Sequence, residues 1–129
     1  MKIKLLTLAA FVAVVFNIVQ ARAETCESGK LVTGNNGHVY CQSNNTMNWW
    51  SAYTWCEAQG RHLATMYELC PDWDGSTGSK CTNYNAFDSA GWTSTASQDN
   101  KAFRVYSPAT GGVVDTTDRK SAYQRAICY

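Results

Sequence analysis

The distribution of apolar and polar residues sets the N-terminal segment apart from the rest of the chain. Residues 5–19 are almost continuously apolar, Lys2 and Lys4 precede them, and a small-x-small triplet follows at 21–23. A positive start, a short apolar run and such a triplet are typical of an export signal. The run is shorter than the roughly 20 residues that span a bilayer. We therefore predict a signal peptide that is cleaved after Ala23.

The next part of the chain has the pattern of a β-hairpin. Two short strand-like stretches, residues 30–33 and 38–41, surround the turn sequence Gly-Asn-Asn-Gly. Asn-Gly favours the positive φ angles of a tight hairpin turn. Because Cys26 and Cys41 flank this hairpin, we expect a local disulfide between them.

Helical periodicity follows over residues 48–60. Asn48 is a typical N-cap, and Gly60 suits the left-handed position that ends a helix. The residues that share one face of this helix are Trp49, Ala52, Tyr53 and Cys56. Trp50 and Trp55 lie off that face, and we expect each to be half-buried against the hairpin or a loop.

A second, shorter helix and a long loop come next. Thr65 and Glu68 form a capping box, in which hydroxyl and carboxylate satisfy each other's free amides, and Pro71 ends the helix. Residues 71–90 are polar, small and rich in turn formers, and we predict a loop tied at its root by Cys70 and Cys81. Long loops in compact domains are usually functional or disordered, and this tie favours a functional loop.

The last third of the chain has strand patterns. We predict four strands, over residues 91–96, 101–107, 112–115 and 121–129. The last of them has apolar residues on both faces, with Ala126 and Cys128 on one and Ile127 and Tyr129 on the other. We therefore expect it in the middle of a sheet rather than at an edge.

The cysteines indicate a disulfide framework. The chain has six, all beyond the predicted signal: Cys26, Cys41, Cys56, Cys70, Cys81 and Cys128. An even number in a short exported chain is typical of disulfides, and fifteen pairings exist for six cysteines. Structural zinc sites use cysteine pairs two to four residues apart, whereas the smallest spacing here is eleven residues. We expect no zinc site.

Charge excludes two classes of partner. Three of the eleven basic residues, Lys2, Lys4 and Arg22, precede the predicted cleavage point, and all ten acidic residues follow it. The mature chain then has eight basic and ten acidic residues, a net charge of −2. Such a balance gives no electrostatic footprint for nucleic acid or for an anionic membrane. We expect neither nucleic-acid binding nor membrane insertion after signal cleavage.

Several motifs together resemble the C-type lectin-like domain. The helix carries Trp-x-x-Ala-x-x-x-Cys-x-x-x-Gly-x-x-Leu-Ala from Trp49 to Ala64, Trp92 lies in a Gly-Trp-Thr-Ser strand, and the chain closes on Ala-Ile-Cys-Tyr. The strand motifs are also similar to bacterial surface and adhesin domains related to that fold. The resemblance covers residues 26–129.

The resemblance implies an α+β fold. It implies an N-terminal hairpin and two short helices, then a small antiparallel sheet, in one domain over residues 24–129 that follows the signal at 1–23. It also implies a disulfide between Cys56 and Cys128 that clamps the first helix to the last strand. With the two local bridges, three disulfides are expected. A bridge that closes so long a loop stabilises a domain by roughly 4 kcal/mol.

The residues do not carry the family's calcium chemistry. The family's sugar-binding motifs, Glu-Pro-Asn or Gln-Pro-Asp followed by Trp-Asn-Asp, do not occur. Residues 97–100, between two predicted strands, are too few for the family's long binding loop. Acidic and amide side chains in the loop at 71–90 offer oxygens of the kind that Ca²⁺ needs, but we favour a solvated turn as their explanation. We expect no metal or other cofactor.

No catalytic group stands out. His38 lies beside the hairpin turn and His62 between the helices, and neither belongs to a recognisable nucleophile–base arrangement. A cysteine nucleophile would leave an odd cysteine unpaired. We predict that the chain is not an enzyme.

The candidate ligand-binding residues lie in the long loop. Trp73 stands between Asp72 and Asp74, with no helix or strand face on which to pack. An exposed aromatic ring there suits stacking on a sugar or anchoring a protein, and the open alternative is that it folds back into the loop's own core. Asn83 and Tyr84 of the same loop complete the predicted site.

A basic group in the strand region has two interpretations. It comprises Arg104, Arg119, Lys120 and Arg125, and it either reads an acidic glycan or forms a solvated face. The leading hypothesis is a secreted or periplasmic, non-enzymatic recognition or adhesion module for a glycan or an extracellular protein. The alternative is a structural subunit of a surface appendage or extracellular matrix. The sequence leaves the oligomeric state open.

Overall fold

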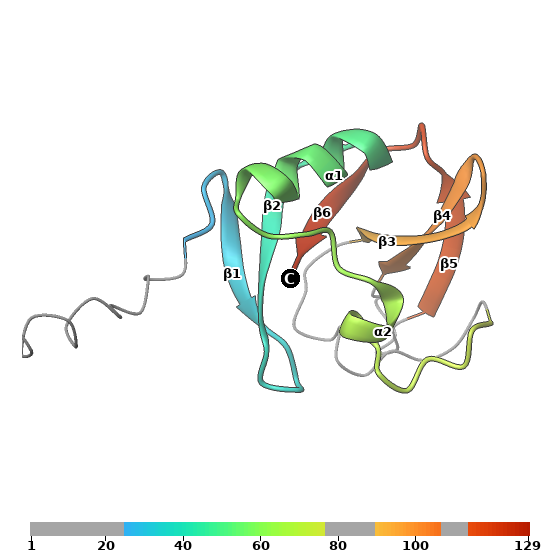
Figure 1. Cartoon of the computed structure of the whole chain (residues 1–129), viewed down its shortest axis with the longest axis horizontal. Coiled ribbons are helices and arrows are strands. Elements are labelled where there is room, and N and C mark those ends of the chain that lie inside the picture. Colours follow the sequence, from blue (N-terminus) through green and yellow to red (C-terminus); the bar gives the residue numbers. More distant parts are fainter. Residues whose placement is uncertain (1–24, 77–89, 107–113) are drawn as a thin grey trace, which may run out of the picture.

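The computed structural model describes residues 25–76, 90–106 and 114–129. The predicted signal peptide lies outside these residues. In chain order the elements are β1 (Gly29–Thr33), β2 (Val39–Met47), α1 (Trp49–Ala58), α2 (Met66–Leu69), β3 (Gly91–Gln98), β4 (Lys101–Tyr106), β5 (Val114–Arg119) and β6 (Gln124–Cys128) (Figure 1). The described residues therefore form six strands of five to nine residues and two helices, of ten and four residues.

The strands form one six-stranded sheet in the order β1-β2-β6-β3-β4-β5. Neighbouring strands are antiparallel except β3 and β6, which run parallel. The sheet is curled into a half-barrel. The expectation that the last strand is central is confirmed, since β6 pairs with both β2 and β3 and Ala126, Ile127 and Cys128 are buried.

The predicted α+β fold is wrong, because the described part of the chain is mostly sheet. The sequence favoured a strand only to residue 41, since the polar residues after it resemble a loop. In the structure β2 continues to Met47. It resumes pairing with β6 at Thr46 and Met47 after an irregularity, where the Ser43 hydroxyl accepts the hydrogen bond of the Ala126 amide. A partner strand, invisible in local sequence, stabilises this polar stretch as sheet.

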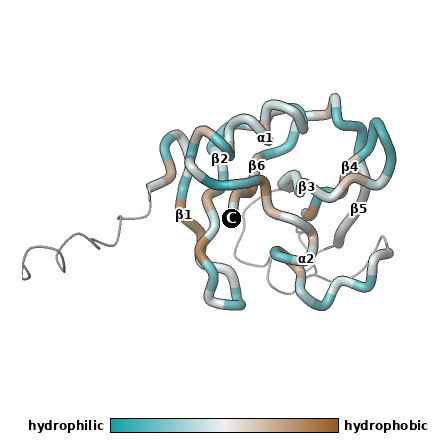
Figure 2. The backbone as a smooth tube through the Cα atoms, viewed as in Figure 1, coloured by the Kyte–Doolittle hydropathy of each residue, from teal (hydrophilic) through white to brown (hydrophobic). Residues whose placement is uncertain are grey.

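The sheet has one helix on each face. On one face, α1 buries Ala52 and Cys56 in a cluster with the indole of Trp92. On the other face, α2 buries Met66 and Leu69 in a second cluster. Figure 2 shows how hydrophobic residues along β1 give way to a hydrophilic turn before β2. The predicted hairpin is confirmed, with strands β1 and β2 paired in antiparallel register.

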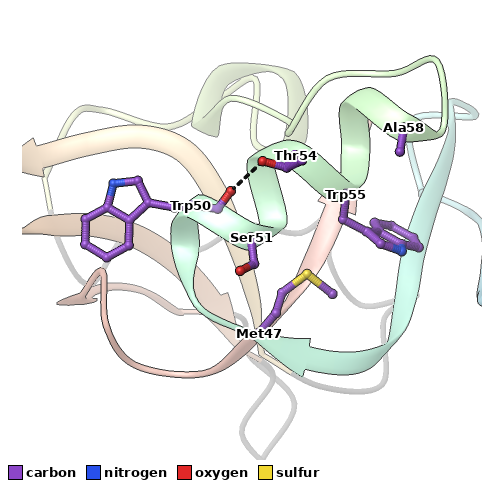
Figure 3. Close-up of a pocket in the computed structure, with 6 residues that line it drawn as sticks. All are labelled: Met47, Trp50, Ser51, Thr54, Trp55 and Ala58. Carbon is purple, nitrogen blue, oxygen red and sulfur yellow. Dashed lines mark hydrogen bonds between the residues drawn. The ribbon is translucent and has the colours of Figure 1, made fainter.

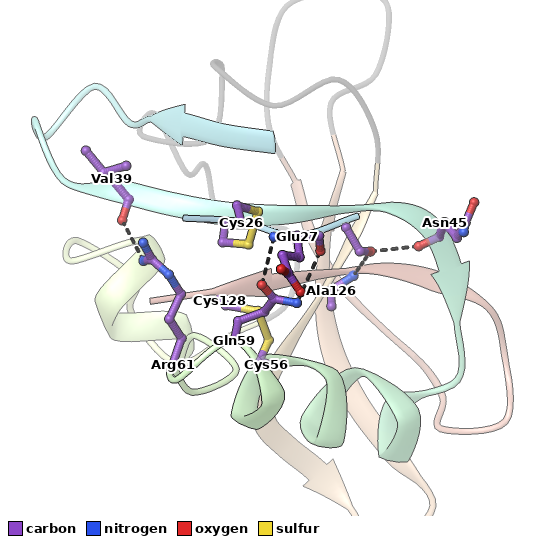
Figure 4. The surroundings of a disulfide bond; sticks show 11 residues. Cys26, Glu27, Val39, Asn45, Cys56, Gln59, Arg61, Ala126 and Cys128 are labelled. Carbon is purple, nitrogen blue, oxygen red and sulfur yellow. Dashed lines mark hydrogen bonds between the residues drawn. A yellow bond between two sulfur atoms is a disulfide. The ribbon is translucent and has the colours of Figure 1, made fainter. Parts of the chain in front are cut away.

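Two disulfides are described instead of the expected three. Cys26 bonds to Cys41 and Cys56 to Cys128, as predicted, with Cα–Cα distances of 5.5 and 5.4 Å (Figure 4). The predicted bridge between Cys70 and Cys81 involves a residue outside the described ranges, and no free thiol occurs in those ranges. The second disulfide fixes α1 to the central strand β6, and this attachment positions the site described next.

Candidate functional site

Helix α1 begins and ends where its sequence predicts. The Asn48 side chain accepts a hydrogen bond of 2.9 Å from the Ser51 amide, and Gly60 has a φ of +70° beyond the last turn. The Cys56 side of the helix faces the sheet. A different side, offset from it, carries Trp50, Ser51 and Thr54 and is open to solvent.

A groove runs along this open side of α1. It is lined by Met47, Trp50, Ser51, Thr54, Trp55 and Ala58, and its volume is about 670 Å³ (Figure 3). We call it the α1 groove. In Figure 3 the two indoles lie at opposite ends and Met47 lies between them on the strand side. The lining is mainly apolar, with two hydroxyl groups and no ionisable side chain.

Trp50 is the most accessible ring of the groove. Its residue surface is 53% exposed. The ring meets Trp49 edge-on, with centroids 6.2 Å apart and planes at 86°. Thr54 donates a hydrogen bond to the Trp50 carbonyl, one turn earlier in the helix. The expectation of half-burial is thus wrong for Trp50, because this residue lies on the open side of α1 and not on the side of Cys56 that faces the sheet.

Trp55 is half-buried, as expected, and packs against the start of β1. Gly29 makes this approach close: a Cβ atom there would lie 3.1 Å from Cη2 of Trp55 and 2.5 Å from the carbonyl oxygen of Gln42. The absence of a side chain at Gly29 therefore sets the position of the Trp55 ring at its end of the groove.

Two further contacts fix the groove to the sheet. The Gln59 side chain pairs with the backbone of Glu27 in both directions, at 2.9 and 3.1 Å (Figure 4). The buried indole N–H of Trp92 donates to the carbonyl of Met47 at 2.9 Å. With the Cys56–Cys128 bridge, these contacts hold the helix and β2 at a set spacing, so the groove is largely pre-formed.

A second group of side chains lies beside the groove, where α1 begins. It comprises Trp49, Tyr53 and Lys120, and we call it the aromatic corner. The Lys120 Nζ atom lies 4.1 Å from the centre of a Trp49 ring, and Tyr53 meets Trp49 at 4.8 Å. The Lys120 carbonyl accepts from the Trp49 amide at 2.9 Å. The turn after β5 is thereby attached to the first residue of α1.

The structure describes three of the five residues of the predicted loop site. Trp73 is 9% exposed, its indole N–H donates to the Ser76 carbonyl, and its ring packs edge-on against Phe103. The alternative in which Trp73 packs inward is therefore the one observed. Asp72 and Asp74 are exposed, and Asp74 accepts hydrogen bonds from Ser76.

The remaining two residues of that predicted site, Asn83 and Tyr84, lie outside the described residues. The described part of the loop thus presents carboxylates but no accessible indole. Loop-site binding remains a prediction for the part that includes Asn83 and Tyr84.

Both histidines contact the aromatic ring of Tyr129. The Tyr129 ring is 5.5 Å from the His38 ring and 5.7 Å from the His62 ring. His62 also pairs with Glu68 at 2.6 Å. Partial burial raises the pKa of Glu68, but hydrogen bonds from the Thr65 backbone and from His62 outweigh it, so the pKa is lowered. These contacts tie α2 to the strand end and are structural.

The predicted basic group does not form one surface. Arg104 pairs with Asp118 at 3.5 Å, whereas Arg119 is exposed. Lys120 is buried with 8% of its surface exposed, and Arg125 is half-buried on β6. The positions of these residues in the sequence do not show that Arg119, at the end of β5, is exposed while Lys120, in the turn after it, is buried.

One feature of the sequence indicated the α1 groove. Trp50 and Trp55 lie off the buried face of a helix that has two other aromatic residues, and an aromatic residue off the core face is a candidate for binding. In the described residues no cluster of three metal-ligating side chains occurs, and no helix there is long and apolar enough to cross a bilayer.

Comparisons of the chain with protein families, with curated proteins and with solved structures find no match.

Proposed function

We propose that this chain is an exported, non-enzymatic recognition module that binds a saccharide in the α1 groove without calcium. The observation that carries the proposal is Trp50, with 53% of its residue surface exposed, at one end of a groove that Trp55 closes at the other. The resemblance to C-type lectin-like domains, based on the α1 motif, is part of the proposal. The site itself is placed on a helix face and needs none of that family's calcium motifs.

The lining chemistry supports a saccharide over a peptide. Sugar rings present apolar C–H faces and a rim of hydroxyl groups, so they suit an aromatic face with a few polar groups beside it. Trp50 and Trp55 supply the aromatic faces, and Ser51 and Thr54 supply hydroxyls that donate and accept. A peptide helix would instead require a longer apolar stripe, which this groove of six residues does not offer.

Export and the non-enzymatic role rest on separate arguments. Two disulfides fit an oxidising compartment such as a periplasm or the cell exterior. The groove lining holds no ionisable side chain that could act as a general acid or base, so the Ser51 and Thr54 hydroxyls have no activating group in the lining. Both histidines contact Tyr129 instead, which packs against the core cluster on the α2 face of the sheet.

The proposal is tested by a glycan array followed by calorimetry on the best ligand. We expect Trp50→Ala to weaken binding at least tenfold, since aromatic anchors dominate such sites. The matched control is Tyr67→Ala, which removes another exposed aromatic side chain, 58% exposed, from α2. EDTA is expected to leave the affinity unchanged. No saccharide binding, or equal losses in the two variants, would refute the proposal.

A structural subunit is the second candidate, and one observation favours it. Strand β1 pairs only with β2 in the described sheet, and Leu31 on this edge is 42% exposed. An open edge with an apolar side chain is a template for pairing with another chain. Ordered polymers in electron micrographs, lost in Leu31→Lys, would favour assembly; a monomer on size-exclusion chromatography at high concentration would exclude it.

A further inference from the structure

Lys120 is a buried cation with an unusual partner. Only 8% of its surface is exposed, yet the contact found for its ammonium is the face of Trp49, at 4.1 Å. It takes part in neither of the two ion pairs, His62–Glu68 and Arg104–Asp118, found in the described parts of the chain. A desolvated ammonium is costly unless it is paired, and an indole face compensates it only in part.

Positive charge reaches the region of Lys120 from two sources. Helix α1 has no acidic residue in its first turn, so no carboxylate there compensates the positive end of its dipole. Arg119 precedes Lys120, and Lys101 lies directly opposite Arg119 in the β4–β5 ladder. Like charges opposite one another destabilise a sheet. Two further basic residues thus lie at this end of the sheet, and the buried ammonium of Lys120 itself is the group that favours a negatively charged occupant.

The same corner adjoins the α1 groove. The Trp49 ring lies 6.2 Å from the Trp50 ring and 4.1 Å from the Lys120 ammonium. A sugar stacked on Trp50 would place its neighbouring ring, or a substituent of its own, towards Lys120. A ligand of two linked sugar rings is therefore long enough to contact both Trp50 and the ammonium.

We infer that the ligand is an acidic saccharide, and that Lys120 binds its carboxylate while Trp50 stacks on an adjoining ring. This inference rests on the proposed saccharide site and names the class of its ligand. A carboxylate beside Lys120 would complete the ion pair that the described residues do not supply, and a hydrogen bond between charged groups is shorter and stronger than a neutral one.

A purely structural role is the competing explanation of the Lys120–Trp49 contact. In that role the side chain covers an indole and helps to hold the turn after β5 against α1. The two roles differ in their readout, because a structural cation affects all ligands equally through stability. A binding cation discriminates between a carboxylate and its neutral counterpart.

The test compares a uronic-acid disaccharide with its carboxyl-reduced form, by calorimetry on the mature protein. Wild type is expected to bind the acidic form about tenfold more tightly, a difference of about 1.4 kcal/mol, and to lose this preference as salt is added. Lys120→Met should abolish the preference between the two forms, whereas Lys120→Arg should retain it. The matched control, Lys30→Met on β1, removes the same charge at the far edge of the sheet.

The outcomes separate this inference from the proposed function. If Trp50→Ala weakens both disaccharides while Lys120→Met keeps the full acidic preference, the saccharide site stands and the role of Lys120 is refuted. If wild type binds neither form, the saccharide site and the inference both fail. Should Lys120→Met not fold, the NMR signals of the Lys120 side chain in wild type decide: a shift with the acidic form alone supports the inference, and no such shift overturns it.

Discussion

Gly29→Ala is expected to destabilise the protein and to distort the α1 groove together. The new Cβ atom would lie 2.5 Å from the Gln42 carbonyl oxygen, 2.7 Å from the Cys26 sulfur and 3.1 Å from the Trp55 ring. Two of these neighbours are fixed, since the oxygen belongs to the backbone of β2 and the sulfur to a disulfide. The Trp55 ring and the start of β1 must therefore move.

The magnitude follows from the number of contacts that must shift. Overpacking of this kind typically costs 1–3 kcal/mol, and with two rigid neighbours we expect about 2–3 kcal/mol for Gly29→Ala. Gly37→Ala is the control, because a Cβ atom there meets nothing within 4 Å. Its cost comes only from the positive φ of +82°, which amounts to about 1 kcal/mol.

Urea unfolding followed by tryptophan fluorescence measures both effects. With a slope of about 2 kcal/mol/M, the midpoint should fall by about 1 M for Gly29→Ala and by about half as much for Gly37→Ala. The native emission spectrum should change only in Gly29→Ala, since only this substitution moves Trp55. A Gly29→Ala protein with the stability and the spectrum of wild type would refute the steric argument.

Three further substitutions test other parts of the structure. Replacing Cys56 and Cys128 together by Ala should lower the free energy of unfolding by about 4 kcal/mol, and equal stability in oxidising urea titrations would contradict this. Gln42→Met should raise stability by about 1 kcal/mol, because both polar atoms of the fully buried Gln42 side-chain amide lack a partner among the residues that the structure describes. Thermal unfolding measures this change, and a loss of stability would count against it. The pKa of Glu68 is lowered from its ordinary value of 4.5, so the ionised carboxylate stabilises the fold at pH values above 4.5. This contribution is lost as the pH falls through the lowered pKa. The melting temperature of Glu68→Gln should therefore differ from that of wild type at pH 7 and converge with it at low pH.

Local features of the fold were predictable because their causes lie within a few residues. The hairpin turn, the Asn48 cap and the capping box at Thr65 and Glu68 each depend on groups close in sequence, and the structure has all three. The central position of β6 also followed, since only a strand covered on both sides carries apolar residues on both faces. The fold class did not follow, because the polar half of β2 is sheet only through its pairing with β6.

The candidate site was predictable to a smaller extent. Trp73 met the sequence criteria for an exposed ring, yet Phe103 from β4 and Tyr67 from α2 pack around it. Trp50 was expected to be half-buried and is instead the exposed ring of the groove. Exposure of an aromatic side chain depends on which distant strand or loop comes to cover it, and no local pattern contains that information.

The sequence by itself predicted the export signal, the local Cys26–Cys41 disulfide and the limits of the helices, of which the structure has the last two. These depend on composition and on neighbouring residues. Only the tertiary structure decided that the strands form one curled sheet, that the open side of α1 carries a groove, and that Lys120 lies on the Trp49 ring. The physical reason is that burial, pairing and ion contacts join residues far apart in the chain, and their free energies depend on geometry that folding alone provides.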